Sequence, residues 1–143
     1  MEKLLVKGVE VQFSYFSKEL QEKLYLNNKE EFQEDAANSQ YEDIRRLLIE
    51  DNQTTDKILK QVLKKDMEQE CISNMVSILK HPNFKENKAI FDKLSQSKNW
   101  EIREITAMAS NSFEFLNEML INELEGEEDG DVKQAIFDNP RFK

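Results

Sequence analysis

Lys80-His81-Pro82-Asn83-Phe84 and Asp138-Asn139-Pro140-Arg141-Phe142 are two versions of a phrase that recurs along this chain: a helix end carrying His or Asn, then a new helix start. From Asn52 through His81 and Asn111 to Asn139, the steps are 29, 30 and 28 residues. Ala36-Ala37-Asn38-Ser39 is an irregular earlier copy. A nearly constant period indicates a repeated structural unit.

A second phrase keeps the same period. Ile44-Arg45, Ile102-Arg103 and Val132-Lys133 each place a β-branched apolar residue before a cation, and Cys71-Ile72 keeps only the apolar part. A unit of this length holds two short helices and two tight connections. We expect each arginine to reach an acid in the neighbouring repeat.

Apolar residues recur at helical spacing within each unit, as Ile44, Leu47 and Leu48 do in a predicted first helix. The second helices carry similar sets, for example Ile58, Leu59, Val62 and Leu63. Capping boxes, in which a cap residue and the third residue after it satisfy each other's amides, are predicted at five helix starts. They are Asn28/Glu31, Ser39/Glu42, Asp66/Gln69, Asn83/Glu86 and Asn111/Glu114.

The first sixteen residues fit two patterns. Val9, Val11, Phe13 and Tyr15 alternate as in a strand, whereas Leu5, Val9, Phe13 and Phe16 step as in a helix. Capped helices follow and no second strand stands out, so a helix is favoured. We expect an N-terminal helical extension over residues 1–40 and a repeat array over 41–143, in one continuous domain. The repeat units are predicted at about 41–65, 66–96, 97–125 and 126–143.

Val132-Lys133-Gln134-Ala135-Ile136-Phe137-Asp138-Asn139-Pro140 resembles the V-R-x-x-[VA]-A-x-N-P phrase of the leucine-rich repeat variant family, and the same units resemble HEAT-like repeats. The resemblance covers residues 41–143. It implies an all-α fold, a short right-handed α-solenoid of about three and a half helical hairpins that stack on a shared core. The sequence departs from the variant family in its longer period and in lacking an N-terminal cysteine cluster. We also expect an open C-terminal end, which is covered either by a C-terminal tail packed back on the body or by self-association.

Composition narrows the class of protein. Hydrophobic residues make up 38% of the 143 residues, below the roughly 45–50% of an average globular chain, which suits a thin helical core. The net charge of −9 disfavours non-specific binding to nucleic acid or anionic membranes. One cysteine excludes an internal disulfide. With no signal-peptide pattern and no apolar run of membrane length, we expect a cytoplasmic protein, and the Lys-, Glu- and Asn-rich composition favours a bacterial origin.

Residues that often carry catalysis have plainer interpretations here. His81 stands where other repeats have Asn, so we interpret it as a structural substitute. Cys71 has Glu68 and Glu70 nearby, and negative neighbours do not activate a thiol. The sequence has no phosphate-binding glycine loop and no zinc-protease motif. We therefore expect no enzymatic activity, no cofactor and no metal site.

Lysines form the main candidate binding surface. Lys57, Lys60 and Lys64 share one helical stripe, and Lys85 and Lys88 begin the matching helix of the next hairpin. Second helices line the concave face of HEAT-like folds, so these lysines form either a basic strip there or an ordinary solvated face, and the solvated face is favoured over phosphate binding. A partner-binding surface is accordingly predicted at Lys57, Lys60, Lys64, Lys85, Lys88, Trp100, Asn117 and Glu118.

Trp100 allows two interpretations. It precedes Ile102-Arg103 as Tyr41 precedes Ile44-Arg45. A tryptophan at a helix start is either an exposed contact for a partner or a seal between adjacent hairpins, and the seal is favoured.

An acidic loop is the second candidate surface, at Glu125, Glu127, Glu128, Asp129 and Asp131. Its spacing lacks the ligand pattern of an EF-hand, so a solvated loop or a contact for a basic partner is favoured over calcium. The sequence thus predicts a protein-binding scaffold. The alternatives are DNA-backbone binding through the lysine strip and an acidic inhibitor or immunity-type protein acting through this loop.

Overall fold

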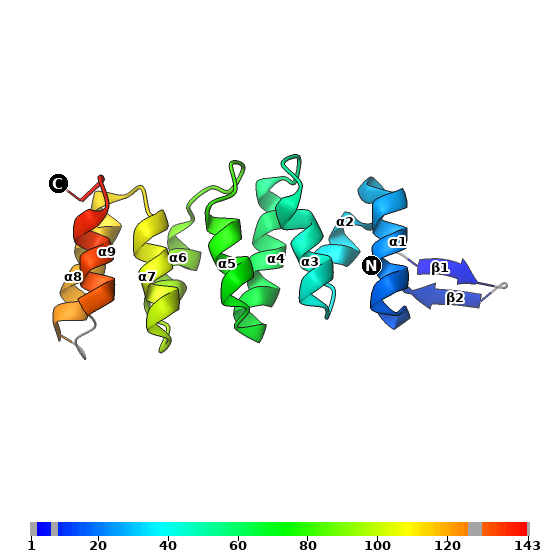
Figure 1. The fold of residues 1–143 in the computed structure, drawn as a ribbon, viewed down its shortest axis with the longest axis horizontal. Coiled ribbons are helices and arrows are strands. Elements are labelled where there is room, and N and C mark those ends of the chain that lie inside the picture. Colours follow the sequence, from blue (N-terminus) through cyan, green and yellow to red (C-terminus); the bar gives the residue numbers. More distant parts are fainter. Residues whose placement is uncertain (1–2, 7–8, 126–129, 143) are drawn as a thin grey trace. The chain divides into compact units, whose positions relative to one another are not determined.

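The computed structural model describes residues 3–6, 9–125 and 130–142, with side chains described for 12–123 and 130–142. Helices occupy most of the described chain from Lys18 onward, which confirms the predicted helical body (Figure 1). The chain divides into two compact units, Met1–Phe84 and Lys85–Lys143. This division falls inside the predicted repeat unit 66–96; the predicted repeat boundaries stay a prediction.

The N-terminal segment is a β-hairpin, so the helix favoured for the first sixteen residues is wrong. Strand β1 (Lys3–Val6) pairs antiparallel with β2 (Val9–Gln12), with Val6 opposite Val9. The partner strand is the segment immediately before β2, so the hairpin pairs locally. Alternating β-branched residues suit such a ladder. A single 3₁₀ turn, η1 (Phe13–Tyr15), follows, and the Phe13 ring stacks on Phe32 at 5.6 Å.

The first unit continues with five helices: α1 (Lys18–Asn27), α2 (Lys29–Ala37), α3 (Glu42–Glu50), α4 (Asp56–Gln69) and α5 (Ile72–Leu79). Helix α2 packs on α4 and α3 packs on α5, so alternate helices lie side by side (Figure 1). The predicted apolar faces are buried between them. The core includes Tyr25, Phe32, Ile44, Leu48, Leu59, Leu63, Met75 and Ile78.

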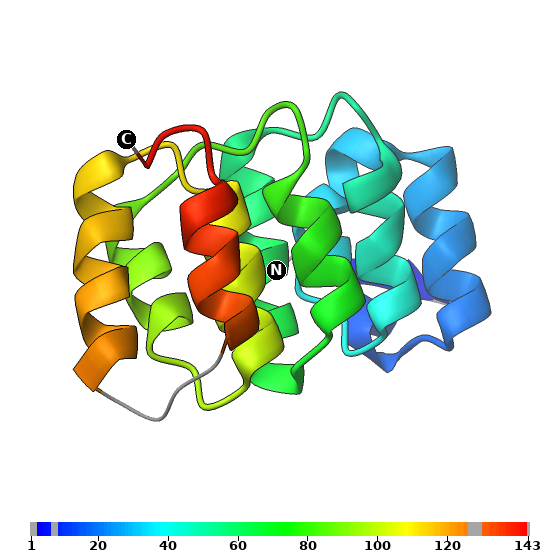
Figure 2. The same cartoon turned by 60° about the vertical axis from the view of Figure 1, so that its left-hand side comes forward.

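The second unit contains α6 (Lys88–Ser95), α7 (Trp100–Ala109), α8 (Phe113–Glu125) and α9 (Gly130–Asp138). Helix α7 packs between α6 and α9, and α9 also contacts α8 (Figure 2). The alternate helices α7 and α9 are again neighbours. Buried side chains include Phe91, Leu94, Ile102, Ala107, Leu116, Met119, Val132 and Ile136.

Most of the predicted capping boxes are wrong in detail. Asn28 does precede α2, and its amide bonds to the Glu31 carboxylate. Other helices begin after residues that the boxes did not include, among them Thr55, Asn87 and Asn99, whose side chains accept N–H groups of the first turn. Several polar residues of the remaining boxes bond across the fold instead. Glu86, for example, accepts from the Ser110 hydroxyl at 2.8 Å.

The recurring His/Asn position is a latch between successive loops. The backbone N–H of Asn83 donates to His81 Nδ1 at 3.0 Å, so Nε2 carries the ring proton and donates to the Asp51 carbonyl at 2.9 Å. Asn139 has the same pattern: its Oδ1 accepts from the Arg141 N–H, and its Nδ2 donates to the Ser110 carbonyl. Both side chains are buried. This geometry supports the interpretation of His81 as a structural substitute for Asn.

Arg45 is fully buried and organises the first unit. Its Nε donates to Asp66 Oδ1 at 2.9 Å, its Nη1 to the Ser39 carbonyl at 2.8 Å, and its Nη2 to Gln69 Oε1 at 2.8 Å. Asn74 of α5 also donates to Asp66 Oδ1, at 3.1 Å. One guanidinium therefore links α4 to the loop before α3, and its carboxylate partner extends the network to α5.

The second unit repeats this arrangement around Arg103. Its Nε donates to Glu123 at 2.9 Å and its Nη1 to the Ser97 carbonyl at 2.7 Å. Both arginines pair with the helix that directly follows their own, α4 for Arg45 and α8 for Arg103. The expectation of an acid in the neighbouring repeat is therefore wrong for Arg103, whose partner lies in its own predicted unit.

The latch can be tested by replacing the imidazole of His81 with an amide in one variant and with a methyl group in another. His81→Asn should change the free energy of unfolding by less than about 1 kcal/mol, because Asn139 makes equivalent bonds with an amide. His81→Ala should lower it by about 1–3 kcal/mol, since it leaves the Asp51 carbonyl and Asn83 N–H without this partner. Urea titration followed by circular dichroism measures both. Equal losses in the two variants would contradict the latch.

Removal of the buried cation should be more damaging. Arg45→Ala leaves the Asp66 charge buried without its ion pair and should lower the free energy of unfolding by about 3–5 kcal/mol in the same titration. Arg46→Ala is the matched control, because Arg46 is partly exposed and its Nε makes one bond, to Asn74. Equal stability of the two variants would contradict the proposed importance of the buried ion pair.

Candidate functional site

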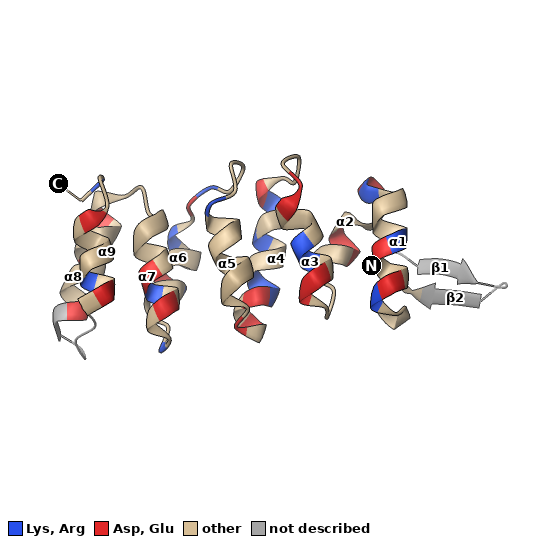
Figure 3. Cartoon of the chain, viewed as in Figure 1, with Lys and Arg blue, Asp and Glu red and all other residues tan. Residues whose placement is uncertain are grey.

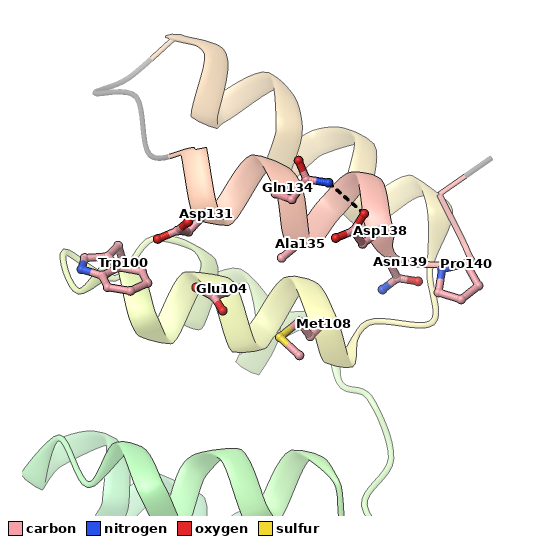
Figure 4. Close-up of a pocket in the computed structure, with 9 residues that line it drawn as sticks. All are labelled: Trp100, Glu104, Met108, Asp131, Gln134, Ala135, Asp138, Asn139 and Pro140. Atoms are coloured by element: carbon pink, nitrogen blue, oxygen red, sulfur yellow. Dashed lines mark hydrogen bonds between the residues drawn. The ribbon is translucent and has the colours of Figure 1, made fainter.

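A pocket of about 630 Å³ lies along α7 and α9 in the second unit (Figure 4). Helix α7 contributes one face, Trp100, Glu104 and Met108, spaced four residues apart. Helix α9 contributes Asp131, Gln134, Ala135 and Asp138, and the chain after it adds Asn139 and Pro140. We call this site the α7–α9 groove. Its volume is within the range of pockets that hold a ligand.

Trp100 lies at one end of the groove and Met108 toward the other (Figure 4). Their exposed fractions are 41% and 57%. Trp100 is the first residue of α7, which Asn99 starts by accepting the Glu101 N–H at 2.9 Å. Trp100 therefore lies beside α9, as the seal interpretation expects, but it remains partly exposed to solvent. Large exposed apolar side chains in a concavity are typical of binding sites.

Hydrogen bonds connect the two helices that form the walls of the groove. Asn139 Nδ2 donates to the Ala107 carbonyl at 2.7 Å and to the Ser110 carbonyl at 2.9 Å, joining the end of α9 to the end of α7. Along the helices, Val132 and Ile136 of α9 and Ile102 of α7 are buried. The groove is therefore preformed.

The groove is acidic. Its described lining includes the carboxylates of Glu104, Asp131 and Asp138 and no lysine or arginine. Asp131 faces the Trp100 end in Figure 4. One oxygen of Asp138 accepts from Gln134 Nε2 at 2.8 Å (Figure 4). A ligand that enters meets net negative charge beside an aromatic face.

In the first unit, the predicted lysine strip is interrupted by carboxylates. Lys60 Nζ lies 2.5 Å from Asp56 and 5.5 Å from the centroid of the Phe84 ring, and Lys57 Nζ lies 3.7 Å from Glu34. Lys64 is exposed on the same helix. Figure 3 shows acidic and basic residues interleaved on α4.

In the second unit, Lys88 lies 3.1 Å from Asp92 and 3.6 Å from Glu118, another predicted contact residue. The hydrogen bond and charge of Asp92 raise the pKa of Lys88. Lys85 and Asn117 are exposed. The structure thus brings Lys88 and Glu118 together as an ion pair, while Trp100 belongs to the α7–α9 groove.

The predicted acidic loop lies mostly outside the described residues. This applies to Glu127, Glu128 and Asp129, and to the side chain of Glu125. Asp131 is described, and it is the member of this set that lines the groove.

A second exposed patch consists of three phenylalanines. Phe142 stacks on Phe113 of α8 at 5.5 Å and meets Phe137 of α9 edge-on at 5.7 Å. Phe113 and Phe137 are about half exposed. These three rings pack on one another, and none of them lines the α7–α9 groove.

The surroundings of Cys71 disfavour its thiolate form. Burial and a hydrogen bond to Glu42 raise the pKa of its thiol to about 11, with Asp66 adding to the shift and Arg45 opposing it. Burial likewise raises the pKa of Asp66, although Asn74 and Arg45 lower it through hydrogen bonds. These shifts belong to the buried network around Arg45.

Among the described residues, no helix is both long and apolar enough to cross a bilayer. No three His, Cys, Asp or Glu side chains there converge as metal ligands would.

The sequence pointed to Trp100 and Asp131 but missed the rest of the groove. Glu104 and Met108 follow Trp100 at intervals of four, the spacing that aligns side chains on one helix face. The sequence therefore does contain this groove face, as an aromatic, an acidic and a sulfur-containing side chain on one side of the helix. It matches no motif, since an aromatic, a carboxylate and a thioether share no single function.

Comparison with known proteins adds no relative: no family model matches the chain, and neither a curated protein nor a solved structure matches it.

The thiol environment predicts slow alkylation. With a pKa of about 11, against 9.0 for an ordinary thiol, Cys71 has about a hundredfold less thiolate at pH 8 in the folded protein. Iodoacetamide should modify it correspondingly more slowly than in urea, as mass spectrometry can follow. Because folding raises this pKa, the folded state should also lose stability as the pH rises from 9.0 through about 11. Alkylation at equal rates in both states would contradict the assignment.

Proposed function

We propose that this protein is a non-enzymatic protein-binding module that holds a segment of its partner in the α7–α9 groove. The observation that carries the proposal is the preformed groove itself, with Trp100 and Met108 exposed inside it. Tryptophan is among the side chains that most often dominate binding energy, particularly in a pocket that excludes water. Because hydrogen bonds already hold α7 and α9 together, the groove also loses little conformational freedom when a partner binds.

We further propose that the helices form HEAT-like hairpins of a short α-solenoid. Three features support this: the packing of α3 on α5, the packing of α7 on α9, and the bonds shared by Arg45 and Arg103. In such folds each hairpin buries its apolar face against the next, and the stacked helices present grooves to partners. In this proposed repeat, α7 and α9 are the first helices of successive hairpins, and the α7–α9 groove lies between them.

Binding of nucleic acid through the lysine strip has less support. Lys57, Lys60 and Lys88 each lie within 4 Å of a carboxylate, which offsets their charge toward phosphate. The acidic surface of the groove disfavours phosphate as well.

The proposal predicts that partner capture depends on Trp100. In pull-downs from the cells that make the protein, Trp100→Ala should reduce capture of the partner at least about tenfold, since it removes the largest exposed ring of the groove. The matched control is Phe113→Ala, because Phe113 is 45% exposed and lies outside the groove lining.

Capture that survives nuclease and is lost with Trp100→Ala alone supports the module. Capture that both variants retain would refute the groove as the binding site. Material that disappears on nuclease treatment would instead favour nucleic-acid binding.

A further inference from the structure

The chemistry of the groove indicates which segment it binds, and this inference rests on the proposed function. The described lining presents three carboxylates, Glu104, Asp131 and Asp138, without a basic residue. These carboxylates repel a ligand of like charge. Charge complementarity therefore favours a cationic ligand.

Trp100 sharpens this preference. Trp100 is 41% exposed, and Glu104 follows it by one helical turn on the same face of α7. Asp131 projects toward this end of the groove from α9 (Figure 4). A lysine or arginine attracted to these carboxylates can lie over the ring, where the negative face of the π-system also attracts it. The stem of such a side chain is apolar and packs on the indole.

The rest of the groove suits an apolar side chain. Met108 is 57% exposed, and Ala135 and Pro140 add apolar surface along the lining. The eight-residue separation of Trp100 and Met108 corresponds to about 12 Å along a helix. An extended chain rises about 3.3 Å per residue and covers this distance in about four residues.

We infer that the α7–α9 groove binds a short extended peptide segment of a partner protein. Its lysine or arginine lies over Trp100 between Glu104 and Asp131, and its apolar side chain, about four residues away, contacts Met108.

A displayed library of random dodecapeptides tests this inference, with the whole chain as bait and Trp100→Ala for counter-selection. Peptides that need Trp100 should share a lysine or arginine and an apolar residue about four positions apart. A synthetic peptide of that consensus, followed by fluorescence anisotropy, should bind at least about tenfold more weakly to Trp100→Ala. It should bind about fivefold more weakly to the double variant Glu104→Gln/Asp131→Asn.

Two controls separate local from general effects. Glu19→Gln/Glu22→Gln removes the same net charge from exposed positions of α1 and should leave peptide affinity unchanged. Raising NaCl from about 0.05 to about 0.5 M should weaken binding to the wild type and have less effect on the Glu104→Gln/Asp131→Asn variant.

The outcomes are distinguishable. Trp100-dependent peptides without a basic residue, or with acidic ones, would overturn the inference and leave the groove as a binding site. An equal loss of affinity in the two charge-reduced variants would also overturn it, because the effect would then come from net charge alone. If neither peptide selection nor partner capture depends on Trp100, the inference and the proposed function both fail.

Discussion

The guanidinium of Arg45 has no exposure to water, and this constraint organises the first unit. A buried cation is tolerated only when a counter-charge and acceptors surround it. Asp66 supplies the charge, and the Ser39 carbonyl and Gln69 supply acceptors. Because these groups come from different segments, satisfying the one side chain fixes where those segments lie. Arg103, which is partly exposed, makes corresponding bonds in the second unit with Glu123 and the Ser97 carbonyl.

The regular part of this fold was predictable from sequence. Helical spacing located the helices: the pattern predicts a helix over 17–26, within one residue of α1 at either end, and a shorter one over 32–37, where α2 begins three residues earlier. The His/Asn phrase marked the loops correctly, since the buried latch can be built by an imidazole or an amide and by few other side chains.

The errors have physical causes. The β-hairpin was missed because Val9 and Val11 fit both periods and the partner strand is formed by the residues just before them. The capping boxes misplaced Asp66 and Asn83, since an acid or amide that precedes a turn can equally bond to a distant partner. Only Trp100 and Asp131 of the groove were anticipated. Its remaining lining depends on α7 and α9 lying side by side, and the residues of that lining form no motif that predicts the contact.

The latches and ion pairs have a consequence for the route of folding. His81 bonds to a residue 30 positions earlier, Asn139 to one 29 positions earlier, and Arg45 to one 21 positions later. Each of these bonds closes a loop of about one repeat length or less, so these side chains find their partners within about one repeat of sequence. Folding rates fall as the sequence separation of contacts grows. Each unit is thus built to assemble quickly from neighbour to neighbour, with its buried polar bonds formed one after another.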